Sequence, residues 1–195
     1  MFFAFLEFPD REFSERSFLK PRGAINIATA DQLDLADKFI TQFEGSGVAM
    51  DKWEKDRILT ALPNVQPEWI SAVYEPDCCD IDVSGLHQSY LSDAKKNGVT
   101  PNNRARVESI KWVDGKWHLT TTQGVFVSDR IINAAGAWAD DIASMANVRS
   151  IGIQPMRRTM VQLQTSPPSN QDDPLVVALD GSFYFKPESG GSYWL

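Results

Sequence analysis

The sequence predicts a mixed fold of the α/β or α+β class in a chain of 195 residues. Strand-like and helix-like apolar spacings alternate along the first half of the chain. Three short strands joined by tight turns follow in the middle, and further strands separated by turn residues occupy the last third. This order of elements is typical of a sheet covered by helices.

The first half begins with alternating strands and helices. The apolar residues of 33–43 recur at helical spacing behind Asp31, the expected N-cap, while Gly45 and Gly47 favour the end of that helix. Pro63 ends a second helical stretch. The expected elements are a strand at 24–28, a helix at 33–43, a strand at 48–50, a helix at 51–61 and a strand at 69–74.

A longer helix is expected from Asp82, its N-cap, to about Lys96, with Gly98 as its end. Apolar residues at helical spacing predict a buried stripe on this helix. They are Val83, Leu86, Tyr90, Leu91 and Ala94.

The middle of the chain predicts a three-stranded meander at 106–113, 116–121 and 125–127. Between the first two strands, Asp114-Gly115 is a strong signal for a type I′ hairpin turn. The meander leads directly into the sequence I-I-N-A-A-G-A-W-A-D.

This stretch, 131–140, predicts a strand, a turn and a helix over 138–145. The turn residues Ala134, Ala135 and Gly136 carry almost no side chain, so a large group can approach the backbone closely. In open α/β sheets, ligands bind at the carboxyl ends of strands. The turn is therefore a candidate wall of a cofactor site, and close packing of helix on strand is the alternative.

The last third predicts mainly strands around an exposed loop at 165–174. Arg157 and Arg158 would point to opposite faces of their strand. One would face solvent, and the other would need an anionic or polar partner on the inner side of the sheet. The expected strands lie at 154–164, 175–179, 183–186 and 192–195.

Charge and cysteine usage exclude several function classes. The net charge is −7 and lysines and arginines do not cluster, which disfavours nucleic-acid binding. Cys78 and Cys79 are adjacent, so a relaxed disulfide is disfavoured, and with two distant histidines they form no metal site. No apolar run reaches membrane-spanning length and the first residues do not resemble a signal peptide, so we expect a cytoplasmic location.

The first eight residues, M-F-F-A-F-L-E-F, are mostly large and apolar. Such side chains at a chain end need a partner surface. We expect self-association through this segment or through exposed sheet surface, and we expect the chain to be part of a larger protein.

Three motifs together resemble one known family. N-A-A-G-A-W-A-D, I-G-I-Q-P-M-R-R and F-Y-F-K-P-E are similar to segments of the FAD-dependent D-amino-acid oxidase and glycine/sarcosine oxidase family. The resemblance runs from about Arg22 to Leu195 and covers the middle of the family's pattern, without its N-terminal G-x-G-x-x-G and its C-terminal third. It implies an incomplete FAD-binding Rossmann-like domain interleaved with a mainly antiparallel substrate-domain sheet. On this pattern, 24–80 and 148–195 belong to the substrate domain and 81–147 to the FAD domain.

The resemblance also implies site residues. The backbone of Val107 would meet the adenine, and the small-residue turn would run along the ribityl and phosphate region of FAD, with Trp138 either contacting the cofactor or packing helix on sheet. Tyr184 would donate a hydrogen bond to a substrate carboxylate, and Arg157 would add positive charge. No catalytic acid or base and no metal ligand is implied. The cofactor-binding candidates are Val107, Ala134, Ala135, Gly136 and Trp138, and the substrate-binding candidates are Tyr184 and Arg157.

The implied reaction is oxidation of the C–N bond of an amino acid or a small amine by hydride transfer to the flavin. Two alternatives remain. The same family includes enzymes that oxidise the C–O bond of hydroxy acids or glycerol phosphate. The chain could also be a catalytically silent fragment or binding module that does not hold FAD alone.

Overall fold

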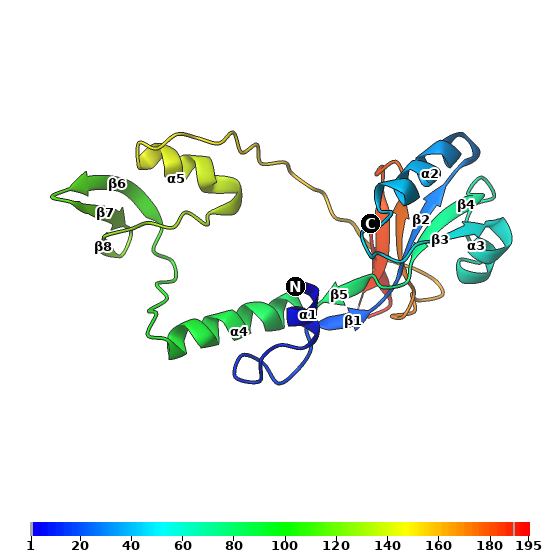
Figure 1. Ribbon diagram of the computed structural model, residues 1–195, viewed down its shortest axis with the longest axis horizontal. Coiled ribbons are helices and arrows are strands. Elements are labelled where there is room, and N and C mark those ends of the chain that lie inside the picture. Colours follow the sequence, from blue (N-terminus) through cyan, green and yellow to red (C-terminus); the bar gives the residue numbers. More distant parts are fainter. Residues whose placement is uncertain (1, 189) are drawn as a thin grey trace. The chain divides into compact units, whose positions relative to one another are not determined.

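The computed structural model describes residues 2–188 and 190–195 and divides into two compact units (Figure 1). The first unit combines Met1–Ser92 with Met160–Leu195, and the second consists of Asp93–Thr159. Helices and strands occur in both, so the expected mixed fold class is confirmed.

The first unit is built on a mainly antiparallel sheet. Among the described residues its strand order is β3-β4-β2-β10-β11-β12-β9, and only the central pair β2–β10 is parallel. The strands are β2 Ala24–Ala28, β3 Asp51–Glu54, β4 Ser71–Glu75, β9 Gln162–Gln164, β10 Leu175–Ala178, β11 Tyr184–Glu188 and β12 Ser192–Trp194.

Alternation along the strands gives this sheet two different faces. The core face carries the buried side chains of Ile25, Ile27, Trp53, Ala72 and Val176, and Ile58 of α3 (Lys55–Ala61) packs on it. Burial of this aliphatic and aromatic surface is the main source of stability in the unit. We call the opposite side, which carries Asn26, Lys52, Tyr184 and Lys186, the polar face.

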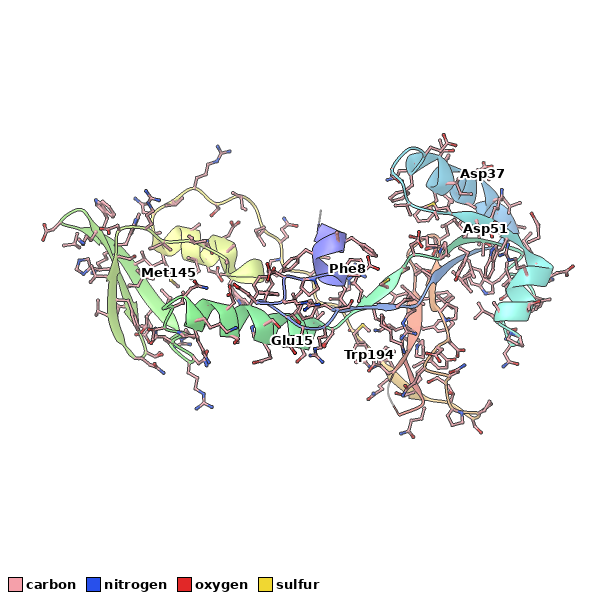
Figure 2. The ribbon with its side chains drawn as sticks, turned by 60° about the horizontal axis from the view of Figure 1, so that its bottom comes forward. Phe8, Glu15, Asp37, Asp51, Met145 and Trp194 are labelled. Atoms are coloured by element: carbon pink, nitrogen blue, oxygen red, sulfur yellow. The ribbon has the colours of Figure 1, made fainter. Side chains whose placement is uncertain are left out.

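Helix α2 (Leu33–Gln42) contacts β2 and β4. It buries Ala36, and its Asp37 forms an ion pair with Lys52, so α2 covers part of the polar face. Helices α2 and α3 thus lie on opposite faces of the sheet; Figure 2 labels Asp37 on α2 and Asp51 at the start of β3.

A two-stranded ribbon joins the N-terminal segment to this unit. Strands β1 (Leu19–Pro21) and β5 (Cys79–Ile81) pair antiparallel, and the short helix α1 spans Phe2–Glu7. Leu6 is buried, and the ring of Phe5 contacts that of Phe13. Part of the apolar N-terminal run is therefore covered within the chain itself.

The second unit contains the meander of β6 (Val107–Val113), β7 (Lys116–Thr121) and β8 (Gly124–Ser128). Asp114 and Gly115 both have positive φ, 48° and 77°, which confirms the type I′ turn expected there. Helix α5 (Ala139–Met145) packs on β6.

Helix α4 (Val83–Lys96) begins as the sequence predicts, because Asp82 Oδ1 accepts the Gly85 backbone N–H at 2.8 Å. Its expected buried stripe is wrong: Val83 is 67% exposed and Tyr90 49%. Gly85 is the buried residue of the helix, and a Cβ there would lie 2.5 Å from Arg16 Nη2. The ring of the half-exposed Tyr90 contacts the rings of Phe5 and Phe13, so α4 meets the N-terminal segment through this aromatic side chain and through the close approach of Arg16 to Gly85.

Five further local expectations are wrong. Gln32, not Asp31, is the N-cap of α2, since Asp31 lies in a preceding 3-10 turn over Ala30–Gln32. No strand forms at 48–50; instead β3 occupies the start of the expected helix at 51–61, because pairing with β4 buries Trp53. The described residues 131–132 and 154–161 also form no strand, although Val161 exchanges backbone hydrogen bonds of 2.8 and 2.9 Å with Leu195 beside the end of β9.

Substitution of Gly23, the residue just before β2, tests how closely the sheet is packed. Its φ is +75°, and an added Cβ would lie 2.7 Å from Tyr74 Oη. We expect Gly23→Ala to cost about 1–2 kcal/mol from the left-handed backbone and about 1–3 kcal/mol more from the clash. Gly45, with φ +74° and open space around its Cβ position, is the matched control. Equal shifts of the denaturation midpoint for Gly23→Ala and Gly45→Ala would contradict this packing.

Candidate cofactor and substrate site

The small-residue turn is open on the side of its backbone. After Ala134 and Ala135, the residues Gly136–Trp138 form one turn of 3-10 helix that continues into α5. Gly136 has φ +56°, and no heavy atom lies within 4 Å of the position its Cβ would take. Ala134 and Gly136 are exposed, and Trp138 is 69% exposed. Residues 134–136 thus present mainly main chain, and Trp138 presents its indole, to whatever approaches the turn.

The asparagine that opens this motif braces the turn from within. Asn133 Nδ2 donates to the Ala139 carbonyl at 2.8 Å, and Asn133 Oδ1 accepts the Ala135 N–H at 3.2 Å. One amide group therefore ties the beginning of the turn to the beginning of α5. Both the oxygen and the nitrogen of this side-chain amide therefore form hydrogen bonds within the chain.

Asp140, the aspartate that ends the motif, forms hydrogen bonds with the backbone of a following segment. Asp140 Oδ1 accepts the Ile151 N–H at 3.0 Å, and Oδ2 accepts the N–H groups of Gly152 and Ile153, each at 2.9 Å. The Ile151 hydrogen bond, together with those of Ile153 and Gly152, outweighs desolvation and holds the pKa of Asp140 below its ordinary value.

Val107 begins β6 and is half-buried, opposite Thr121 of β7. The pairing shifts register between Val107 and Ser109, so a bulge lies at this end of the strand. Val107 and the small-residue turn lie in the same unit. That Val107 and the turn contact FAD stays a prediction.

Tyr184 is the first residue of β11 and lies on the polar face. Its hydroxyl donates to the sulfur of Met160 at 3.2 Å, a weak acceptor that a carboxylate oxygen would readily replace. Two residues on, Lys186 Nζ lies 3.3 Å from Asp80 Oδ1 and 3.7 Å from Glu188 Oε1. A phenol and an ammonium group therefore share this face of the strand.

Arg22 is the residue near this site that the sequence did not single out. Its guanidinium is only 8% exposed, pairs with Asp80 at 2.5 Å and donates to the carbonyls of Gln171 and Asp173 at 3.2 and 2.6 Å. Burial alone would raise the pKa of Asp80, but the Arg22 hydrogen bond and the charge of Lys186 outweigh it, so this pKa lies below its ordinary value. Proline before and glycine after Arg22 were the only local signals.

Arg157 is exposed and lies in a segment without regular structure, within the second unit, whereas Tyr184 belongs to the first. The strand that was to carry Arg157 and Arg158 does not form around them. A role for Arg157 in substrate binding stays a prediction.

A cavity of about 540 Å³ opens on the core face, away from Tyr184. Aromatic rings line one wall, and each contacts the next in the order Trp69, Phe183, Phe185, Tyr193. At its rim, burial and the hydrogen bond and charge of Asp173 raise the pKa of Tyr193 to about 12.

Cys78 and Cys79 are free, as expected. Within 2–188 and 190–195, no cluster of side chains could hold a metal ion, and no helix is long and apolar enough to cross a membrane.

Comparison of the sequence with known families gives the family of this chain. The pattern of the FAD dependent oxidoreductase (DAO) family matches residues 3–195. The chain belongs to this family, and the resemblance seen in the three motifs is confirmed.

Several curated relatives share part of their length with the chain. Mitochondrial dimethylglycine dehydrogenase of Rattus norvegicus is 29% identical over 175 residues, which cover 87% of this chain and 20% of the relative. The human protein is 30% identical over 176 residues with the same coverage. Monomeric sarcosine oxidase of Bacillus sp. is 24% identical over 150 residues, covering 74% of this chain and 38% of the oxidase.

Solved structures of similar fold include L-proline dehydrogenase from P. horikoshii, with a TM-score of 0.75, 20% identity, and coverage of 90% of this chain and 48% of that one. Glycine oxidase from Geobacillus kaustophilus has a TM-score of 0.73, 20% identity, and coverage of 94% and 50%. L-alpha-glycerophosphate oxidase from Mycoplasma pneumoniae, solved with FAD bound, has a TM-score of 0.72, 19% identity, and coverage of 91% and 49%. The chain thus spans about half the length of these structures and has their fold.

Asp80 makes the stability of the first unit depend on pH. Its folded pKa is lowered, so its contribution is complete above about pH 4, the ordinary range of aspartate, and is lost as the pH falls through the folded value. At pH 7, Asp80→Asn should cost about 2–4 kcal/mol, because Arg22 keeps a buried charge without its partner.

The wild type should also lose stability in acid more steeply than Asp80→Asn, as followed by urea unfolding at pH 7, 5, 4 and 3. Asp172→Asn removes an exposed partner of Lys20 and should cost less than about 1 kcal/mol. Parallel pH profiles for wild type and Asp80→Asn would show that the pair contributes nothing.

Proposed function

We propose that this chain supplies the FAD-contacting turn and part of the substrate surface of an oxidoreductase that acts on an amino acid or a small amine. The observation that carries the proposal is the turn at 134–138, whose backbone is open while both polar side chains of its motif are used to brace it. Membership of the FAD dependent oxidoreductase family supports the choice of cofactor.

The residues present fit an extended cofactor. Ala134, Ala135 and Gly136 leave room for the ribityl and phosphate groups beside the backbone, and the indole of Trp138 is free to contact a flat ring. The main chain of Val107 would face the adenine. The assignment of 81–147 to an FAD domain, and of 24–80 and 148–195 to a substrate domain, is part of this proposal.

When bound, the flavin would accept a hydride from the carbon that bears the amine. The role of this chain would be to bind and orient the cofactor and the substrate. Tyr184 would exchange its hydrogen bond with Met160 for one to a substrate carboxylate. Lys186 on the same face is already paired with Asp80 and Glu188, so the phenol is the group of this strand that would bind the substrate. Arg157 would add positive charge to the substrate surface.

The names of the relatives support an amine or amino-acid substrate, because dimethylglycine dehydrogenase, sarcosine oxidase and glycine oxidase occur among them. A C–O bond is the second candidate, favoured by the anaerobic glycerol-3-phosphate dehydrogenase of Haemophilus influenzae, which is 26% identical over 126 residues that cover 61% of this chain and 22% of the relative. The exposed apolar strand β8 favours self-association of the isolated chain.

Cofactor binding can be tested on the chain as it stands, by titrating FAD with purified protein and following flavin fluorescence polarisation and the visible spectrum. We expect Ala134→Leu to lower the affinity about tenfold or more, because a side chain would occupy the open side of the turn. Ala30→Leu, an equal change at an exposed site in the first unit, should leave the affinity unchanged.

Bound flavin that bleaches anaerobically with sarcosine but not with glycerol 3-phosphate would support the amine substrate, and the reverse would support the second candidate. Absence of any FAD binding by the folded chain would leave the hypothesis of a silent fragment or binding module.

A further inference from the structure

Residues 140–153 form a closed loop. Helix α5 has only seven residues, Ala139–Met145, a length that is marginal for a helix by itself. At its end, Asn147 adopts φ +54° and the Val148 N–H bonds the Ala143 carbonyl at 2.9 Å, which turns the chain. The N–H groups of Ile151 to Ile153 then meet the carboxylate of Asp140 at the start of the same helix.

We propose that Asp140 is a positioning residue for the small-residue turn. Its carboxylate closes the loop 140–153 and so fixes the first turn of α5, to which residues 134–138 are directly joined. This inference rests on the proposed function only for its consequence for FAD binding. The closure of the loop by Asp140, which we call the clamp, rests on geometry alone.

Three features make the clamp strong. It consists of three charge-assisted hydrogen bonds of 2.9 to 3.0 Å, which are stronger than bonds between neutral groups. Gly152, with φ +86°, allows successive N–H groups to converge on one carboxylate, as in a backbone nest. The negative charge also lies in the first turn of α5, where the helix dipole favours it.

The clamp acts on the turn together with Asn133. Asn133 Nδ2 bonds the carbonyl of Ala139, the residue next to Asp140, and its Oδ1 bonds the Ala135 N–H. The Trp138 N–H in turn bonds the Ala135 carbonyl at 3.1 Å. Displacement of the start of α5 would therefore be passed to Ala135 and Trp138 through these bonds.

The chain offers a matched control in Asp141, the next residue of α5. Its side chain is exposed and makes no hydrogen bond or ion pair with the residues that the structure describes. Asp140→Asn and Asp141→Asn remove the same charge from the same helical turn. Asp140→Asn, however, also replaces an acceptor oxygen by an N–H₂ donor that faces backbone N–H groups.

The experiment is amide hydrogen exchange on the purified chain without cofactor. In Asp140→Asn, the amides of 151–153 should exchange at least about tenfold faster, and those of Ala135 and Trp138 should also lose protection. Asp141→Asn should match the wild type. Asp140→Ala, which removes the acceptor without adding a donor, is the second variant if Asp140→Asn does not fold.

Two results would overturn the proposal. Unchanged exchange at 151–153 would show that there is no clamp, and faster exchange at 151–153 with unchanged exchange at Ala135 and Trp138 would show that Asp140 does not position the turn. FAD titration adds a separate readout: a fivefold or greater loss of affinity in Asp140→Asn alone is expected. If the wild type binds no FAD, the proposed function fails while the exchange data still decide the role of Asp140.

Discussion

The first unit depends on one junction between segments that are far apart in the chain. Strand β10 adds in parallel to β2, and the Leu175 N–H bonds the Gly23 carbonyl just before the pairing begins. At the same point Arg22, 151 residues before Asp173, holds the carbonyls that precede β10 and pairs with Asp80 of the neighbouring ribbon. A buried guanidinium with several donors suits this role, because it can satisfy one carboxylate and two carbonyls at once.

This junction explains why the unit is discontinuous. Both partners of the central parallel pair must be in place before either face of the sheet is complete, and the whole second unit lies between them in sequence. The loop that must close is long, but the entropy cost of closure grows only slowly with length. A compact insertion that folds on local contacts, such as the meander, fits this arrangement because it shortens the flexible part of the loop.

The parts of the fold that the sequence predicted best are those set by local chemistry. The hairpin at Asp114-Gly115 follows from two residues that tolerate positive φ, and the start of α4 follows from the Asp82 cap. Strand β3 could not be seen in this way, since its segment has helical spacing and becomes a strand only by pairing with β4. Arg22 was missed for the same reason: its partners Asp80 and Asp173 are distant in sequence.

In the N-A-A-G-A-W-A-D turn, likewise, the sequence predicted one feature and not the other. Its small residues predicted an open backbone, and the structure has one. Its polar residues, which a ligand site would ordinarily present outward, instead face the protein: Asn133 binds the ends of the turn and Asp140 binds the returning chain. Apart from the exposed indole of Trp138, contacts from such a turn come from peptide groups, whose positions depend on backbone geometry and not on side-chain identity. A site of this kind therefore needs a rigid frame more than it needs reactive side chains, and that frame lies in the residues on either side of it.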